Sequence, residues 1–392
     1  MISALFFTWF FAATLWTVNA LRRPVPPGRR FAPLWLPGMI VSELAPWLLI
    51  VRTLVALAFI RAGALDLTIG RAGLALFVVS ELGLVPLLVR SWRSAREAGT
   101  SPTPIGLLRA RTRVPAGVVA TRELRYWNDL TLDVYALPGA RAAPALIYLH
   151  PGSWMRGRPG RQALPLLYRL AATGWVVLDI RYPLSPVATF PEHLIGVKRA
   201  IAWAKDEGSS LGIDPARVAI AGASSGAHLA ALAALTWDHP DLQPGFEKSD
   251  TSLIACAPHY GIYDLLVRNP TRYDWPFVAR HVMKAQPLEA PELYRLGSPL
   301  DLVRPDAPPF LVVHGSFDSV VLAEESRVFV AALRLAAGKV DYHEVRGGQH
   351  GFDAIPSLRT RSVGRLVADF LIAAANPDTG SSAPATGSEE EG

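Results

Sequence analysis

Cysteine is almost absent from this chain of 392 residues, and that absence excludes several kinds of site. The single cysteine, Cys256, cannot form an intrachain disulfide. It lies in the apolar run 253–257, which predicts a buried structural thiol. No cluster of residues has the spacing of a zinc or iron–sulfur site, so we expect no metal.

Acidic residues are scarce in the first part of the chain, and this explains the net charge of +6. Residues 1–114 contain thirteen arginines and four acidic residues, whereas acidic residues slightly outnumber basic ones in the remainder. The arginines flank apolar segments, which is the pattern of a membrane region. Nucleic-acid binding is therefore not needed to explain the positive charge, and we expect no nucleic-acid partner.

Three long apolar runs precede residue 97. The first has no charged residue and is long enough to span a bilayer as a helix, whereas the others contain Glu43, Arg52 and Glu81. Charged groups are costly at membrane depth, so we expect these three to face other helices or to pair with one another. The runs cover residues 2–21, about 36–60 and about 72–89.

The first apolar run could alternatively be a cleaved signal peptide, because residues 18–20 weakly resemble a cleavage site. It lacks the basic region that such a signal needs, and two more apolar runs follow it. We therefore predict a transmembrane helical region of about three spans over residues 1–96. A polar linker is predicted over residues 97–115.

Arginine is concentrated in two loops, at residues 22–30 and 90–113. With three spans both loops fall on one side of the membrane, which should be the cytoplasmic side. This predicts a multi-pass protein of the cell membrane whose C-terminal domain is cytoplasmic. If only two runs span the membrane, that placement could invert.

Short strand-like and helix-like runs alternate over residues 116–375. This alternation predicts an α/β fold with a mainly parallel sheet and helices on both faces. Residues 237–300, which are richer in Pro, Tyr and Arg, are expected to form a cap over the sheet edge and to shape a substrate pocket. Residues 376–392 have little apolar content and are predicted to be disordered.

The most informative stretch is Gly222-Ala-Ser-Ser-Gly226, a G-x-S-x-G pattern that follows a strand-like run and precedes an apolar helix-like run. In such a turn the central serine, Ser224, stands above the sheet beside a helix N-terminus whose N–H groups favour developing negative charge. The alternative is an ordinary strand-to-helix turn whose small residues serve packing alone.

A serine nucleophile needs a base, and the base needs an orienting acid. Asp318 follows the strand-like run 310–313, and His350 lies in a glycine-rich loop after the run 340–345, so the order along the chain is serine, acid, histidine. Either residue alone could be an ordinary loop residue. Because all three residues occur in this order and the acid and the histidine each follow a strand-like run, we predict that Ser224, Asp318 and His350 are the catalytic residues.

An oxyanion formed at Ser224 would need backbone N–H donors. The N–H of Ser225 is one candidate, and those of Gly152 and Ser153 in the loop His150-Pro-Gly-Ser-Trp154 are the others. His150, Trp154 and Tyr260 are expected to line the substrate pocket. Four other histidines are expected to pack or to line the pocket and not to act as the base: His193, His228, His259 and His314.

From about residue 116 to 374 the chain resembles the hormone-sensitive-lipase-like esterase branch of the α/β-hydrolases. The preceding membrane region makes it similar to isoprenylcysteine methylesterases and to membrane-anchored bacterial carboxylesterases. The resemblance rests on residues 150–154, 179–186, 190–191, 222–230, 314–318 and 348–352.

The resemblance implies an α/β-hydrolase fold and ester hydrolysis without a cofactor, with Ser224 as nucleophile, His350 as base and Asp318 as acid. Two departures occur. Pro151 occupies the position of the branch's first loop glycine and has no N–H, and Ala223 replaces an acidic residue before the nucleophile. The oxyanion donors come from the next two loop positions, so activity should survive.

We therefore predict a membrane-anchored serine carboxylesterase or lipase that acts through an acyl-enzyme on small-molecule or lipid esters. Two alternatives stay open. One is an acyltransferase or amidase that uses the same three residues, and the other is an inactive membrane scaffold on a hydrolase fold.

Overall fold

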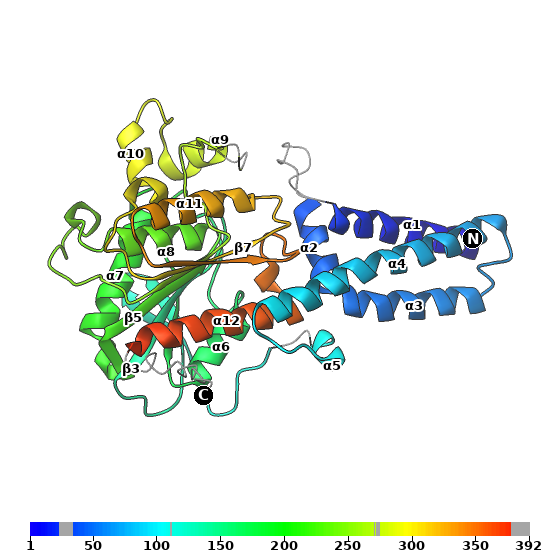
Figure 1. Ribbon diagram of the computed structural model, residues 1–392, viewed down its shortest axis with the longest axis horizontal. Helices are drawn as coiled ribbons and strands as arrows, with labels where there is room; N and C mark the ends of the chain where they lie inside the picture. The colour runs from blue at the N-terminus through cyan, green and yellow to red at the C-terminus, as the bar shows by residue number, and fades with distance from the viewer. Residues whose placement is uncertain (23–33, 110–111, 270, 272–274, 378–392) are drawn as a thin grey trace, which may run out of the picture.

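A computed structural model describes residues 1–22, 34–109, 112–269, 271 and 275–377. A bundle of apolar helices projects from an α/β domain (Figure 1). From residue 378 on, the predicted disordered tail lies outside the described residues. The helices are α1 (Ile2–Leu21), α2 (Trp35–Glu43), α3 (Ala45–Arg61), α4 (Thr68–Glu97), α5 (Pro104–Leu107), α6 (Leu164–Ala172), α7 (Glu192–Asp206), α8 (Ser225–Leu235), α9 (Trp275–Val278), α10 (Pro291–Leu296), α11 (Ala323–Leu335) and α12 (Leu358–Ala375).

The α/β domain is built on one sheet of eight strands in the order β1-β2-β4-β3-β5-β6-β7-β8. The pairs β1–β2 and β2–β4 are antiparallel, and all the others are parallel. The mainly parallel sheet predicted from the sequence is confirmed. The strands are β1 (Val119–Trp127), β2 (Leu130–Ala136), β3 (Ala143–Leu149), β4 (Val176–Ile180), β5 (Ile213–Ala223), β6 (Cys256–His259), β7 (Phe310–Gly315) and β8 (Val340–Val345).

Alternate residues of the central strands enter two separate cores. In β5, for example, Val218 and Ile220 join the cluster beneath α7, α8 and α11, whereas Ala219 and Ala221 join the cluster beneath α6 and α12. Successive side chains of a strand point to opposite faces, so a sheet with helices on both sides needs apolar residues at every central position. Cys256 is a buried free thiol at the start of β6, as predicted.

The N-terminal bundle consists of α1, α3 and α4, which lie side by side (Figure 1). Among the described residues, α1 and α4 are each long and apolar enough to cross a membrane, and the bent pair α2–α3 would make a third span if it counts as one. Arg52 donates a hydrogen bond to Thr17 Oγ1 at 2.9 Å and lies 4.0 Å from Glu81. The expected pairing of charges within the bundle therefore holds for Arg52 and Glu81.

The second apolar run differs from the single span expected over residues 36–60. The helix breaks at Leu44, and α2 and α3 meet at an angle of 85°. Pro46, in the first turn of α3, cannot donate a backbone hydrogen bond to the preceding turn. Glu43, which was expected to face other helices or to pair with Arg52 or Glu81, forms a buried ion pair with Arg359 of α12, a helix of the α/β domain.

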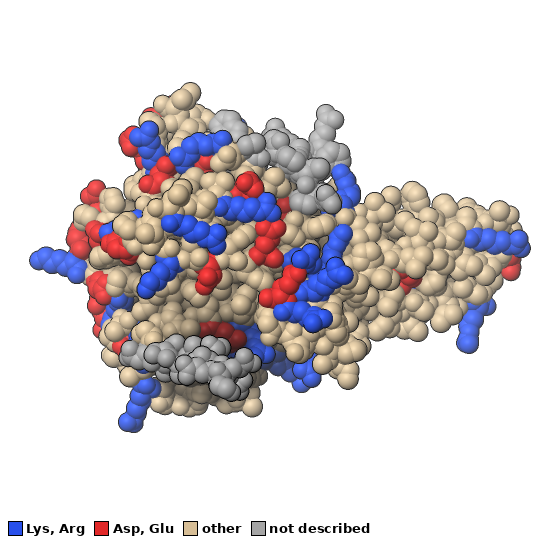
Figure 2. All heavy atoms as spheres, viewed as in Figure 1, with Lys and Arg blue, Asp and Glu red and all other residues tan. Residues whose placement is uncertain are grey.

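Two further contacts join the bundle to the α/β domain. Glu97 at the end of α4 forms an exposed ion pair with Arg346 at 2.7 Å, and the guanidinium of Arg90 lies 4.3 Å from the centre of the Phe317 ring. The bundle surface in Figure 2 is almost free of charged side chains between its two ends.

Candidate active site

The predicted serine turn lies where β5 passes into α8. Ser224 has the backbone angles φ 53° and ψ −117°, and its N–H donates to the carbonyl of His259 at 2.9 Å. A non-glycine residue at positive φ is strained and persists where its surroundings hold it in place. Gly226 is required here by space, because a Cβ at that position would lie 2.2 Å from the carbonyl oxygen of Leu149.

The structure brings the three predicted catalytic side chains together. Ser224 Oγ lies 3.0 Å from His350 Nε2, and His350 Nδ1 lies 2.7 Å from Asp318 Oδ2. A carboxylate can only accept, so the Nδ1 proton of His350 points to Asp318 and the Nε2 lone pair faces the Ser224 hydroxyl. This arrangement allows His350 to remove the hydroxyl proton of Ser224.

Asp318 is fully buried in the loop after β7, where several donors surround it. Its Oδ1 accepts the N–H groups of Val320 and Val321 at 2.8 and 2.9 Å. Burial alone would raise the pKa of Asp318, but attraction to His350 and a hydrogen bond from His314 outweigh it, so the pKa lies well below its usual range. Asp318 therefore stays ionised.

His314 was expected to be a packing residue beneath the acid loop, and it also contacts the acid. Its Nε2 lies 2.9 Å from the carbonyl of Val321 and 3.3 Å from Asp318 Oδ2, while its Nδ1 lies 2.6 Å from Ser326 Oγ. The carbonyl can only accept, so Nε2 carries the proton and Ser326 donates to Nδ1. His314 thus holds Asp318 in position behind His350.

A second polar network supports the other side of His350. The Tyr260 ring meets the His350 ring edge to face with centroids 4.9 Å apart, and the Tyr260 hydroxyl donates to Asp353. Gln162 Nε2 donates to the Tyr260 hydroxyl at 2.8 Å, and His259 Nδ1 lies 3.0 Å from Asp353. The sequence placed Tyr260 in the pocket but gave no signal for Gln162 or Asp353, because nothing local shows that loops so far apart meet.

The loop after β3 turns sharply at the predicted oxyanion donors. Gly152, Ser153 and Trp154 all have positive φ, at 144°, 56° and 58°. A Cβ on Gly152 would lie 1.7 Å from the carbonyl of Arg156, so the loop folds back on itself too tightly for a side chain there. Within the described part of the chain, the backbone N–H groups of Gly152, Ser153 and Ser225 donate to no acceptor.

His150 and Trp154 both border the cavity. The Nδ1 atom of His150 lies 3.0 Å from the carbonyl oxygen of Pro151, and its buried Nε2 atom has no partner among the described residues. His150 stacks on Tyr182 with ring centroids 4.4 Å apart, and burial lowers its pKa to about 4, so it is neutral at pH 7. Trp154 is buried and donates to His228 Nδ1 at 3.2 Å, while His228 Nε2 lies 2.7 Å from the carbonyl of Gly297. These residues fix the loop against α8 and the segment before β7.

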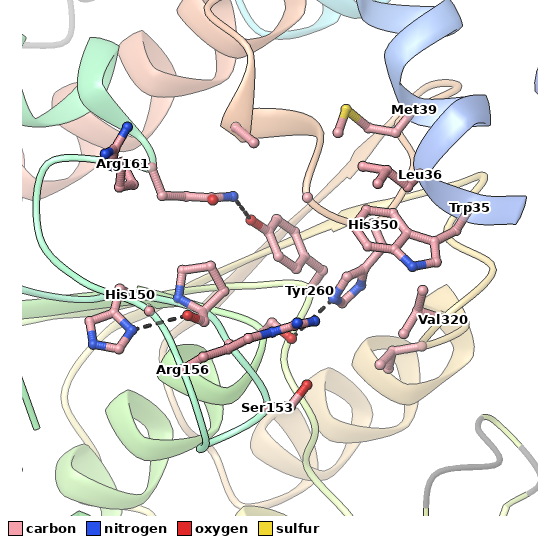
Figure 3. A pocket seen from close by; sticks show the side chains of 18 of the residues that line it. Trp35, Leu36, Met39, His150, Ser153, Arg156, Arg161, Tyr260, Val320 and His350 are labelled. Carbon is pink, nitrogen blue, oxygen red and sulfur yellow. Dashed lines mark hydrogen bonds between the residues drawn. The ribbon is translucent and has the colours of Figure 1, made fainter. Parts of the chain in front are cut away.

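A cavity of about 470 Å³ opens above Ser224 and His350. Of the predicted cap, residues 237–300, only Tyr260 and Ile262 border it among the described residues. One wall comes from α2, through Trp35, Leu36 and Met39 (Figure 3). The sequence did not indicate these three residues as part of the site, since they belong to an apolar run typical of a membrane span.

The opposite side of the cavity carries positive charge. Arg156, Arg158 and Arg161 border it, and none of them forms an ion pair among the described residues. In Figure 3 the side chain of Arg156 extends from its loop into the pocket. The pocket is therefore apolar on the α2 side and cationic on the side of the 156–161 loop.

Comparison with known proteins agrees with this geometry. The family model BD-FAE matches residues 132–333, just over half of the chain. Esterase LipQ of Mycobacterium tuberculosis is 43% identical over 245 residues, which cover 61% of this chain and 58% of LipQ. Esterase LipC of the same organism is 39% identical over 280 residues, which cover 69% of this chain and 68% of LipC. The chain thus spans well under two thirds of LipQ's length.

The fold is also similar to that of solved esterases. A truncated carbohydrate esterase from gut microbiota superposes with a TM-score of 0.58 at 23% identity, covering 68% of this chain and 100% of that one. At this identity the likeness supports the fold alone. The family model and the sequence relatives show that the chain belongs to the BD-FAE family, within the hormone-sensitive-lipase-like esterase branch of the α/β-hydrolases.

Proposed function

We propose that this protein is a membrane-anchored serine esterase that hydrolyses carboxylic esters through an acyl-enzyme. One observation carries the proposal: the Ser224 hydroxyl, the His350 ring and the buried Asp318 carboxylate form a continuous chain of contacts of 3.0 and 2.7 Å at the floor of a cavity. The esterase relatives support the bond type.

In the first half-reaction Ser224 Oγ forms a bond to the ester carbonyl carbon as its proton passes to His350 Nε2. The imidazolium that results is stabilised by the ionised Asp318. The intermediate then collapses, the bond to the alcohol oxygen breaks, and that oxygen takes the proton from His350. The acyl group remains on Ser224.

In the second half-reaction water replaces the alcohol. His350 removes a proton from the attacking water and returns it to Ser224 Oγ when the acid leaves. In both steps the carbonyl oxygen becomes negative beside the N–H groups of Gly152, Ser153 and Ser225, which are free to donate to it. Each such donor typically contributes a rate factor of about 10²–10³.

The membrane arrangement forms part of the proposal. In it, α1, α3 and α4 cross the membrane, and α2 lies at the surface next to the α/β domain. Arg90, Arg93 and Arg96 lie at the domain end of α4, whereas the far end of the bundle has Arg61, Arg71 and Asp66. The excess of arginine at the domain end favours a cytoplasmic α/β domain.

The catalytic part is tested with purified full-length protein in detergent and 4-nitrophenyl acetate. Ser224→Ala should lower kcat by about 10⁴-fold or more and abolish labelling by a fluorophosphonate. Ser209→Ala is the matched control, since it removes an exposed hydroxyl far from the cavity, and it should match wild type. Retained turnover in Ser224→Ala would reject the mechanism. An added alcohol acceptor with product analysis separates hydrolysis from acyl transfer.

Sidedness is tested with protease on sealed vesicles of known orientation. Digestion of the α/β domain from the cytoplasmic face alone is expected. Digestion from the outer face would overturn the proposed topology and leave the catalytic proposal unchanged.

A further inference from the structure

Helix α2 is held between the membrane bundle and the catalytic loops at both of its ends. At its C-terminal end Glu43 pairs with Arg359 and accepts a hydrogen bond from Ser357 Oγ at 2.5 Å. At its N-terminal end Asn19 Nδ2 of α1 donates to the carbonyl of Leu34 at 2.8 Å. The helix is therefore fixed to the α/β domain and to the bundle at the same time.

The face of α2 toward the cavity is apolar and reaches the catalytic histidine. The rings of Trp35 and His350 meet edge to face, with centroids 5.7 Å apart. Met39 is buried at the same wall, whereas Leu36 is 44% exposed although it borders the cavity. In Figure 3 the side chains of Trp35, Leu36 and Met39 lie together along α2 on the side of the pocket where His350 lies.

The loop that follows the acid adds two apolar residues to the wall of the cavity. Val320 and Val321 border the cavity, and their N–H groups are the donors that hold Asp318. A chain of methylene groups lying between α2 and this loop would be removed from water on both sides. Burial contributes about 0.8 kcal/mol per CH₂ group, so such a wall discriminates strongly by chain length.

We propose that α2 is the acyl-chain wall of the active site and that the substrate is an ester of a long, unbranched fatty acyl chain that enters from the bilayer. The proposal rests on the esterase function above and specifies its substrate. In this arrangement the membrane region is a part of the catalytic pocket as well as an anchor. The acyl chain lies along Trp35, Leu36 and Met39 while its carbonyl reaches Ser224.

The first experiment compares 4-nitrophenyl acetate with 4-nitrophenyl decanoate, using the full chain in detergent. Leu36→Ala and Met39→Ala should each lower kcat/KM for the decanoate about five- to tenfold and change that for the acetate less than about twofold. Ile40→Ala is the matched control, because Ile40 is 38% exposed on the same helix but does not border the cavity. It should leave both substrates unchanged.

The acetate separates the two proposals. If wild type hydrolyses acetate through Ser224 but Leu36→Ala and Met39→Ala keep the wild-type ratio of decanoate to acetate, the acyl wall is rejected and the esterase stands. An equal loss on both esters would also reject the wall, since it would indicate damage to His350. Absence of Ser224-dependent acetate turnover would reject the esterase itself.

A second experiment locates the chain directly. A decyl fluorophosphonate with a diazirine at the end of the alkyl chain forms a bond from Ser224 Oγ to phosphorus as fluoride leaves, and light then couples the chain end to its neighbour. Cross-linked peptides from residues 34–43 are expected. Cross-links confined to residues 237–300 would overturn the proposal and assign the chain to the cap.

Discussion

The ion pair between Glu43 of α2 and Arg359 of α12 should be the main interaction that holds α2, and through it the N-terminal bundle, to the α/β domain. Both side chains have no exposed surface, and they join helices 316 positions apart in the sequence. Replacing Glu43 by Gln keeps the shape but leaves the Arg359 charge buried without a counter-charge. Breaking a buried pair in this way costs about 3–5 kcal/mol, because the remaining ion is not returned to water.

A loss of about 3 kcal/mol should lower the unfolding midpoint of the α/β domain by roughly 6–12 °C. The measurement is tryptophan fluorescence during heating of the full chain in detergent. Glu97→Gln is the matched control, because it removes the same charge from an exposed pair with Arg346 across the same junction. An exposed pair contributes about 1 kcal/mol or less, so this variant should shift the midpoint by a few degrees at most.

A double variant, Glu43→Leu with Arg359→Leu, removes both charges and should recover most of the stability lost in Glu43→Gln, since apolar replacements of a buried pair are often neutral. The reasoning would be refuted if Glu43→Gln melted no lower than Glu97→Gln. It would also be refuted if the double variant were less stable than Glu43→Gln by as much as Glu43→Gln is less stable than wild type.

Three further predictions follow from the α/β domain. Asp318→Asn should lower kcat on 4-nitrophenyl acetate by about 10⁴-fold and slow fluorophosphonate labelling in parallel. The reason is that an amide can donate to His350 Nδ1 and so favour the tautomer of His350 that cannot accept the Ser224 proton. A loss of kcat under tenfold would contradict this role of Asp318. Burial lowers the pKa of Lys198 to about 7, so above about pH 7 this residue binds more protons in the unfolded chain than in the folded one. Urea denaturation between about pH 7 and 9 should therefore show a free energy of unfolding that rises more steeply with pH in wild type than in Lys198→Met; equal slopes would contradict this. Arg161→Gln should lower kcat/KM about two- to fivefold for an ester with a phosphate in its alcohol part and leave a neutral ester unaffected; an effect that persisted undiminished at high salt would exclude an electrostatic cause.

Local patterns in the sequence were sufficient to predict the α/β class and the positions of Ser224, Asp318 and His350. The turn around Ser224 is encoded by neighbouring small residues, and the acid and histidine follow β7 and β8, neighbouring parallel strands whose carboxyl ends meet at one edge of the sheet. A buried strand and a turn depend on residues within about ten positions, so the sequence displays them directly.

The composition of the pocket wall depended on contacts that no local pattern records. Trp35, Leu36 and Met39 belong to an apolar run that has the composition of a membrane helix, and only the break at Leu44 turns them toward His350. That break depends on Pro46 and on the ion pair that Glu43 forms with Arg359, a residue more than 300 positions away. Hydrophobicity indicates that a residue is removed from water, but only the packed structure decides whether lipid or a substrate cavity lies against it.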